Sequence, residues 1–187
     1  LIDGIEISEV MISKSKKHKN YKPYIGDIRE ILLEKNFDAV ISLFHVMSYQ
    51  ISNKDLDLVF KNTYQHLNKG GLFLFDFWYS PAVYHLKPEV RIKEFLDEKY
   101  KITKVAEPKI DSNKSQVDVN YTFFVESLED HNIRKFNELH PMRHFSLNEI
   151  SLIASKNGFK FFKSGEWLTN NPPSEKTWNV YVILKKI

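Results

Sequence analysis

The chain has 187 residues, a length that suits one domain with its own hydrophobic core. Apolar residues make up 42% of the sequence, but no run of about 18 apolar residues occurs, so no membrane partner or membrane span is expected. The absence of cysteine excludes disulfides, thiolate metal sites and a cysteine nucleophile, and a net charge of +3 is mild.

A dense basic run lies on a predicted helix near the start of the chain, at Lys14, Lys16, Lys17 and Lys19. Because no aromatic residues are interleaved with these lysines, a solvated helix face explains them better than nucleic-acid binding. We therefore expect no nucleic-acid partner, and the absence of cysteine is compatible with the cytoplasmic protein that we expect.

The first 80 residues alternate strand-like and helix-like segments. The stretch "LIDGIEI" predicts a buried parallel strand, and Ser8 then caps a helix whose Val10 and Met11 face a sheet. The pattern continues with a strand at 22–27, a short helix at 29–35, a strand at 37–44, a helix that starts at 53 and is ended by Gly70 and Gly71, and a strand at 72–78. This order indicates βαβ units and a parallel sheet.

The pattern changes in the middle of the chain. Residues 117–125 alternate apolar and polar side chains, which is typical of an antiparallel strand with one wet face, and 100–110 and 132–145 are its expected neighbours. Ser146 and Glu149 form a predicted capping box for a helix that ends at Gly158. Two final strands are expected at 159–164 and 178–186.

The expected architecture is therefore a single α/β domain over residues 1–187, with a β-rich insertion at 87–145. Such an insertion follows a strand of the parallel sheet and begins at its carboxyl edge. Open α/β sheets bind their ligands at that edge, so the insertion is expected to cover a substrate as a lid.

Two acids end predicted strands and are candidates for nucleotide binding. Glu6 could accept hydrogen bonds from ribose hydroxyls, and Asp27, 21 residues later, reaches the same edge of the sheet. A surface acid near a helix N-terminus explains Glu6 equally well, and Asp27 could simply cap the turn at Arg29.

Further polar and aromatic side chains follow the next two strands. His45, Ser48 and Tyr49 come after one strand, and Trp78 and Tyr79 come at the end of the other, with Asp76 just before them. These residues could line a substrate crevice, although a core or lid role explains Trp78 equally well. His140 and His144 are four residues apart, but Pro141 and the strand-like context argue against a zinc pair, and no metal site is expected.

Four blocks in order resemble class I S-adenosylmethionine-dependent methyltransferases: "GIEISEVMI", "GDIRE", "FDAVISLFHVMSY" and "HLNKGGLFLFDFW". The segment "LHPMRHFSLNEISLIASKNGF" further resembles the subgroup that N-methylates amino sugars on nucleotide carriers, including the N,N-dimethyltransferases of macrolide deoxysugar pathways. The resemblance implies a Rossmann-like sheet with helices on both faces and an antiparallel β insertion that forms a lid.

The resemblance also implies S-adenosyl-L-methionine as cofactor and a small-molecule acceptor, while a homodimer is left open. It assigns the cofactor to Glu6, Ile7, Asp27, Ile28, Leu43 and Phe44, the acceptor to Trp78, Tyr79 and Arg143, and orientation or deprotonation of the acceptor to His45, Tyr49 and His140. The subgroup often carries a histidine where this chain has Tyr49, so the identity of any base is open.

The first strand and the "GxGxG" loop of the resembled family have no counterpart in the sequence, and we expect an N-terminal truncation to account for them. Two alternatives stay open. The chain could methylate another small molecule at nitrogen or oxygen, or it could be a non-catalytic nucleotide-binding or interaction module if the glycine loop is truly absent.

Overall fold

The computed structural model describes residues 1–16, 18–169 and 171–187, so Lys17 of the basic run lies outside the described residues. The elements in chain order are β1 (Ile2–Glu6), α1 (Glu9–Lys14), β2 (Tyr21–Ile25), β3 (Phe37–Ser42), η1 (Val46–Tyr49), α2 (Asn53–His66), β4 (Leu67–Tyr79), α3 (Ser80–Leu86), β5 (Arg91–Leu96), β6 (Tyr100–Asp111), β7 (Gln116–Ser127), β8 (Ile133–Phe145), α4 (Leu147–Lys156), β9 (Phe159–Glu166) and β10 (Asn179–Lys186).

One mixed sheet organises most of the chain. Its strands run in the order β5-β6-β7-β8-β4-β10-β9, and β3 pairs with β4 as a side branch. The β3–β4 pairing is parallel, as the sequence predicts, whereas β10 is antiparallel to both β4 and β9. The expected α/β architecture is therefore confirmed, with antiparallel strands added at both ends of the sheet.

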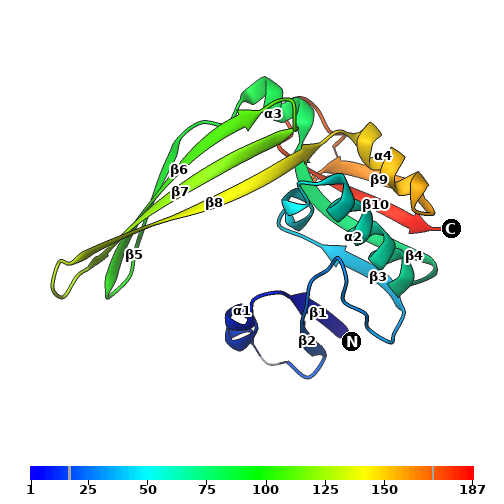
Figure 1. The fold of residues 1–187 in the computed structure, drawn as a ribbon, viewed down its shortest axis with the longest axis horizontal. Helices are drawn as coiled ribbons and strands as arrows, with labels where there is room; N and C mark the ends of the chain where they lie inside the picture. Colours follow the sequence, from blue (N-terminus) through cyan, green and yellow to red (C-terminus); the bar gives the residue numbers. More distant parts are fainter. Residues whose placement is uncertain (17, 170) are drawn as a thin grey trace.

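The hydrophobic core lies between this sheet and the helices α2 and α4 (Figure 1). Phe73, Phe75 and Phe77 alternate along β4 and are fully buried, because side chains two residues apart share one face of a strand. Phe60 of α2 meets Phe73 and Phe75 edge to face, with ring centroids 5.7 and 5.8 Å apart. Each such buried ring stabilises the fold by roughly 1.5–3 kcal/mol.

The strands β5 to β8 project from this core as a long twisted arm, hereafter the arm (Figure 1). Its base packs on α3 through Val83, Val117, Val119 and Met142. Towards its tip the arm has no covering layer, and every residue of β5 is exposed. The antiparallel pairings β6–β7 and β7–β8 confirm the alternating pattern that was read at 117–125.

The first two strands form a separate two-stranded sheet in which β1 and β2 are parallel. The parallel pairing confirms the prediction, but the strand was expected to be buried, and its residues are exposed or half-buried. The expectation that Val10 and Met11 face a sheet is also wrong, since they are 60% and 59% exposed. The helix itself forms, and Ser8 caps it through a hydrogen bond from the Met11 N–H to Oγ.

The predicted helix at 29–35 does not form, because α2 takes the hydrogen bonds that a helix would use. The side-chain amide of Asn62 donates to the carbonyl oxygens of Ile28 and Ile31. The N–H of Leu33 donates to Nε2 of His66. These long-range bonds satisfy the backbone in an irregular turn, so tertiary contacts override a helical local preference.

Two further predictions were only partly correct. The helix α2 ends at His66, before the two glycines, which instead shape the start of β4. A Cβ on Gly71 would lie 2.9 Å from the Asn68 carbonyl oxygen, and Gly70 has φ +80°. At α4, the Glu149 N–H donates to Ser146 Oγ, as a capping box requires, but the Glu149 carboxylate binds Arg143 instead of reaching back.

Candidate active site

The chain leaves β3 through two residues with strained backbones. Phe44 and His45 have φ of +61° and +65°, a left-handed conformation that costs a residue with a Cβ about 1 kcal/mol or more. The strain turns the chain sharply into η1 and leaves the Phe44 ring 80% exposed. Unfavourable backbone geometry of this kind gathers at functional sites, and here it lies at the carboxyl end of a parallel strand.

A buried carboxylate on β4 holds this turn. Asp76 is 1% exposed, and its Oδ1 accepts the backbone N–H of His45. Its Oδ2 lies 2.8 Å from Nδ1 of the same histidine, a close contact that does not meet the geometry of a hydrogen bond. The His45 ring also meets Trp78 edge to face, with centroids 6.0 Å apart. Asp76 and Trp78 therefore fix a histidine that the sequence placed in this crevice.

A second cluster joins η1 to the arm. The Tyr49 hydroxyl lies 2.7 Å from Nδ1 of His140, and Nε2 of His140 lies 3.2 Å from a carboxylate oxygen of Glu138. Tyr121 packs edge to face on the His140 ring, with centroids 4.9 Å apart. The structure thus brings together Tyr49 and His140, which are 91 residues apart in sequence, and adds Glu138 and Tyr121.

Electrostatics decide which way the protons of this cluster point. Burial, followed by the nearby Tyr121 and Glu138, raises the pKa of Tyr49 above its usual value of 10.0. The phenol therefore keeps its proton at neutral pH and donates it to Nδ1 of His140. A neutral imidazole that accepts at Nδ1 carries its own proton on Nε2, where the Glu138 carboxylate accepts it. In the tautomer with the His140 proton on Nε2, these contacts form a directed chain of donors from Tyr49 through His140 to Glu138.

The residues assigned to the cofactor lie at the carboxyl ends of β1, β2 and β3. Glu6 accepts the Ser8 N–H through one carboxylate oxygen, and the other accepts no hydrogen bond within the described residues. Ile7 beside it is 68% exposed, like the Phe44 ring. A free carboxylate oxygen can accept hydrogen bonds from ribose hydroxyls, and exposed apolar side chains can pack on a purine, so these residues fit S-adenosylmethionine.

Three other assigned residues have structural contacts that the sequence could not show. Both carboxylate oxygens of Asp27 accept hydrogen bonds from Arg29, which lowers the pKa of that carboxyl, so the alternative of a local turn contact describes Asp27 well. Ile28 packs against the core, and Leu43 is half-buried before the strained turn.

The residues assigned to the acceptor also have structural contacts. Trp78 meets the His45 ring and packs against the hydrophobic cluster at the base of the arm, whereas Tyr79 packs against the main core. Arg143 has an 11% exposed side chain and donates to Glu149, to Asn53 and, at 3.4 Å, to the Ile51 carbonyl.

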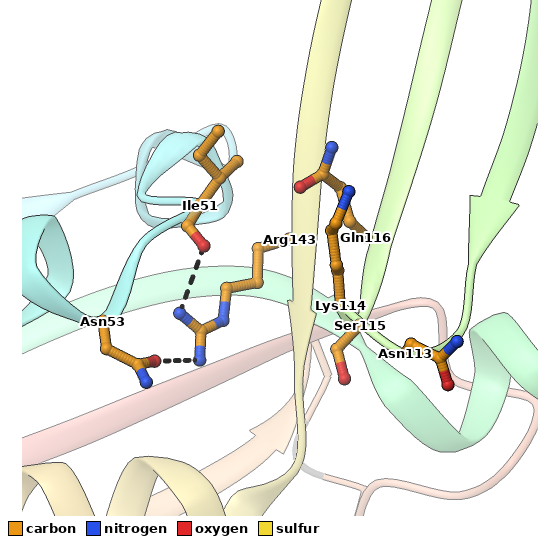
Figure 2. Close-up of a pocket in the computed structure, with 7 residues that line it drawn as sticks. All are labelled: Ile51, Asn53, Asn113, Lys114, Ser115, Gln116 and Arg143. Carbon is orange, nitrogen blue, oxygen red and sulfur yellow. Dashed lines mark hydrogen bonds between the residues drawn. The ribbon is translucent and has the colours of Figure 1, made fainter.

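Arg143 lines an open polar hollow of about 320 Å³, and Figure 2 shows the residues that surround it. The guanidinium points to Ile51 and Asn53, while Lys114 and Gln116 lie on the other side of β8. Neither Tyr49 nor His140 lines this hollow. Arg143 therefore acts here as a clamp between β8, α2 and α4, and the hollow is separate from the two histidine clusters.

Sequence reasoning missed Glu138 and Tyr121, although a signal existed. Glu138 shares a face of β8 with His140 because it lies two residues away. Tyr121 pairs with Glu138 across the β7–β8 register, with Val119 opposite His140. That register follows from the preceding hairpin only once the strand ends are known, and the sequence leaves those uncertain by a residue or two.

Comparisons with known proteins agree with the fold. A family model described as a methyltransferase domain matches residues 1–71. A Bacillus subtilis (strain 168) protein named "Putative methyltransferase YqeM" is 25% identical over 190 residues, covering 99% of this chain and 75% of the relative. The solved structure of an S-adenosylmethionine-dependent methyltransferase from Clostridium acetobutylicum ATCC 824 is 19% identical, with a TM-score of 0.81, and the match covers 98% of this chain and 74% of that one.

The chain is an S-adenosylmethionine-dependent methyltransferase with the Rossmann-like class I fold, and S-adenosylmethionine is its cofactor. The alternative of a non-catalytic module is therefore set aside. Among its relatives is a Saccharopolyspora spinosa enzyme named dTDP-4-amino-2,3,4,6-tetradeoxy-D-glucose N,N-dimethyltransferase, which is 25% identical over 170 residues, covering 85% of this chain and 62% of that relative.

Two kinds of feature are absent from the described residues. Within 1–16, 18–169 and 171–187, no helix is long and apolar enough to cross a membrane. The same part of the chain holds no group of three or more histidine, aspartate or glutamate side chains placed to bind a metal ion.

Proposed function

We propose that this methyltransferase N-methylates an amino sugar attached to a nucleotide carrier, with the arm as a lid over the acceptor. The observation that carries the proposal is the chain Tyr49–His140–Glu138, which joins the core to the arm beside the carboxyl ends of β3 and β4. The relatives support it, since the Saccharopolyspora spinosa enzyme is named for a dTDP-linked amino sugar.

The acceptor amine must present a neutral lone pair in line with the transferred methyl group. When bound, S-adenosylmethionine supplies that methyl group as an electrophile on a sulfonium. Glu6, Ile7 and Phe44 would hold the nucleoside part of the cofactor, through the free carboxylate oxygen of Glu6 and the two exposed apolar side chains. Alignment of two bound reactants can by itself contribute several kcal/mol to the rate.

An amine gains a positive charge when it is methylated, so a proton must leave before or after the transfer. The Tyr49 oxygen can accept this proton while the phenolic proton passes to Nδ1 of His140. The imidazolium that forms is stabilised by the Glu138 carboxylate at Nε2. Every proton is thereby accounted for: one leaves the amine, one moves from Tyr49 to His140, and Glu138 balances the new charge.

His45 is the competing proton acceptor. Asp76 lies against its Nδ1, which favours a proton on that nitrogen and leaves Nε2 free to accept one. The His45 side chain is 24% exposed, so a bound substrate could reach it. The two histidines therefore define two routes for the same proton, and substitution can separate them.

The test is methyl transfer by the protein and three variants to a panel of nucleotide-linked and free amino sugars. If the Tyr49 chain is the route, Tyr49→Phe and His140→Ala lower turnover, by about 10²-fold for the histidine, without weakening cofactor binding. If His45 is the base, His45→Ala does the greater damage. Glu6→Ala is the converse control, because it should weaken cofactor binding by about 1–3 kcal/mol through lost ribose hydrogen bonds.

Turnover close to that of the unaltered protein in all three variants would remove the proposed site. Transfer to hydroxyl or non-sugar acceptors, but to no amino sugar, would replace the proposed substrate while leaving the methyltransferase assignment in place.

A further inference from the structure

One face of the arm continues outward from His140 and carries an unusual set of side chains, hereafter the inner face. Its aromatic residues follow β7 and β8 at two-residue steps, so they share one side of the sheet. Tyr121 contacts His140, and Phe123 lies next, with its centroid 6.2 Å from that of Tyr121. Phe136 stacks on Phe123 at 4.8 Å and is itself 46% exposed.

Cations lie among these rings. Nζ of Lys104 lies 3.7 Å from the centroid of Tyr121 and 5.6 Å from that of Phe123. Strand register places Lys93 opposite Lys104 on the same face, and it places Arg91 in the row of Tyr121 and Glu138. Within the described residues, none of these three cations has a carboxylate at ion-pair distance; by contrast, Lys101 on the opposite face pairs with Glu94 at 3.1 Å.

Unpaired cations beside exposed rings fit a ligand that carries both negative charge and a flat ring. Lysine is a point-charge binder of phosphate, and aromatic side chains stack on nucleobases whatever their sequence. The charged groups in these two rows are the three cations and the Glu138 carboxylate, which His140 holds. This excess of positive charge beside aromatic rings favours a nucleotide as the ligand.

The spacing of the rows matches such a ligand. Antiparallel strands rise about 3.4 Å per residue, so the Tyr121 row lies roughly 7 Å beyond His140 and the Lys104 row roughly 14 Å beyond it. A sugar with its amine at His140 would span the first step and leave its diphosphate near Lys104 and Lys93. The carboxylate in between, Glu138, is held by His140 and so is turned towards the sugar.

We infer that the inner face binds the nucleoside diphosphate carrier of the substrate, with Lys104 and Lys93 on the diphosphate and the half-exposed Phe136 ring on the base. This subsite rests on the proposed function, because its carrier is the one to which the amino sugar is attached. It makes Lys104, Lys93 and Phe136 determinants of specificity for nucleotide-linked over free amino sugars.

The test is calorimetric titration of the protein with dTDP and with inorganic pyrophosphate. Lys104→Ala should weaken dTDP binding by about tenfold or more, because a charge-assisted contact to phosphate is lost. Lys101→Ala, on the same strand but the opposite face, is the matched control and should leave binding unchanged. Phe136→Ala should weaken dTDP but not pyrophosphate, and thermal melting checks that each variant is folded.

The outcomes separate this subsite from the proposed function. Loss of dTDP binding in Lys104→Ala supports the subsite whether or not any amino sugar is methylated. The subsite is overturned if dTDP does not bind, or if Lys104→Ala binds it normally. An equal loss in Lys101→Ala also overturns it, because the effect would then be one of general charge. Methylation of free amino sugars without dTDP binding would keep the methyl-transfer proposal and remove the carrier subsite.

Discussion

The core and the arm belong to one sheet but are built in different ways. In the core, β4 is covered by α2 and α4, and Phe60, Phe73 and Phe75 are 0% exposed. In the distal arm the same backbone pairing continues, yet Phe136 is 46% exposed and β5 is exposed throughout. Aromatic residues therefore have two different uses in this chain: the covered rings supply stability, and the open rings are available to a ligand.

The largest expected effect is on stability, and it comes from comparing the same substitution, Phe to Ala, in the core and in the arm. Phe75→Ala should lower the free energy of unfolding by about 3–5 kcal/mol, because it removes buried apolar surface and leaves a cavity between β4 and α2. Phe136→Ala should lower it by less than about 1 kcal/mol, since its ring is half-exposed already. Denaturant titration measures both, and equal losses would break the contrast between core and arm.

The second prediction concerns the joint at which the arm meets the core. His144 pairs with Trp78 there and is 0% exposed, and burial, followed by the charge of Arg143, lowers the pKa of His144 from 6.5 to about 4. In the unfolded chain the His144 imidazole is therefore protonated below about pH 6.5, whereas in the folded chain it is protonated only below about pH 4. The contribution of neutral His144 to the free energy of unfolding is fully present above pH 6.5. It falls as the pH drops from 6.5 to about 4, by up to about 3 kcal/mol.

Unfolding free energies at pH 7 and pH 4.5 check this prediction, with His144→Gln as the variant that cannot titrate. The variant should be less stable at pH 7, because Ser80 loses the partner that lies 2.8 Å from it, but it should lose less stability on acidification. Parallel pH profiles for the two proteins would mean that His144 does not cause the loss of stability at low pH.

The smallest expected effect lies at the strained turn between core and site. Phe44→Gly removes the cost of a Cβ in the left-handed region, so the free energy of unfolding should stay unchanged or rise by up to about 1 kcal/mol. The same change removes the exposed ring and should weaken S-adenosylmethionine binding. Melting curves and calorimetry measure the two effects, and a variant that loses stability would show that the ring is packed rather than presented.

Much of the fold could be predicted because periodic patterns survive in the sequence. The alternation at 117–125 and the apolar stripe of α2, with Leu56, Val59 and Phe60, depend on local spacing alone, and both were found. The helix predicted at 29–35 was wrong because Asn62 and His66, about 30 residues away, bind its backbone. No local pattern carries that information.

The candidate site shows the same division. His45, Tyr49 and Trp78 could be placed from the ends of β3 and β4, because parallel strands bring their carboxyl ends to one edge. The pairing of Tyr49 with His140 depends on where the arm returns to the core. The contribution of Glu138 depends on strand register, and that of Asp76 on its burial under a strained turn. These are properties of the assembled sheet.

The junction between arm and core is narrow, and this has a kinetic consequence. Backbone pairing joins β4 to β8 through Trp78 with His144 and Tyr79 with Phe145, and Arg143 clamps this end of β8 to α2 and α4. A small bend of the arm beyond this clamp would carry His140 away from η1 and separate it from Tyr49. Entry of a bulky acceptor and assembly of the proton route would then exclude each other in time, so the rate of arm closure would set an upper limit on turnover.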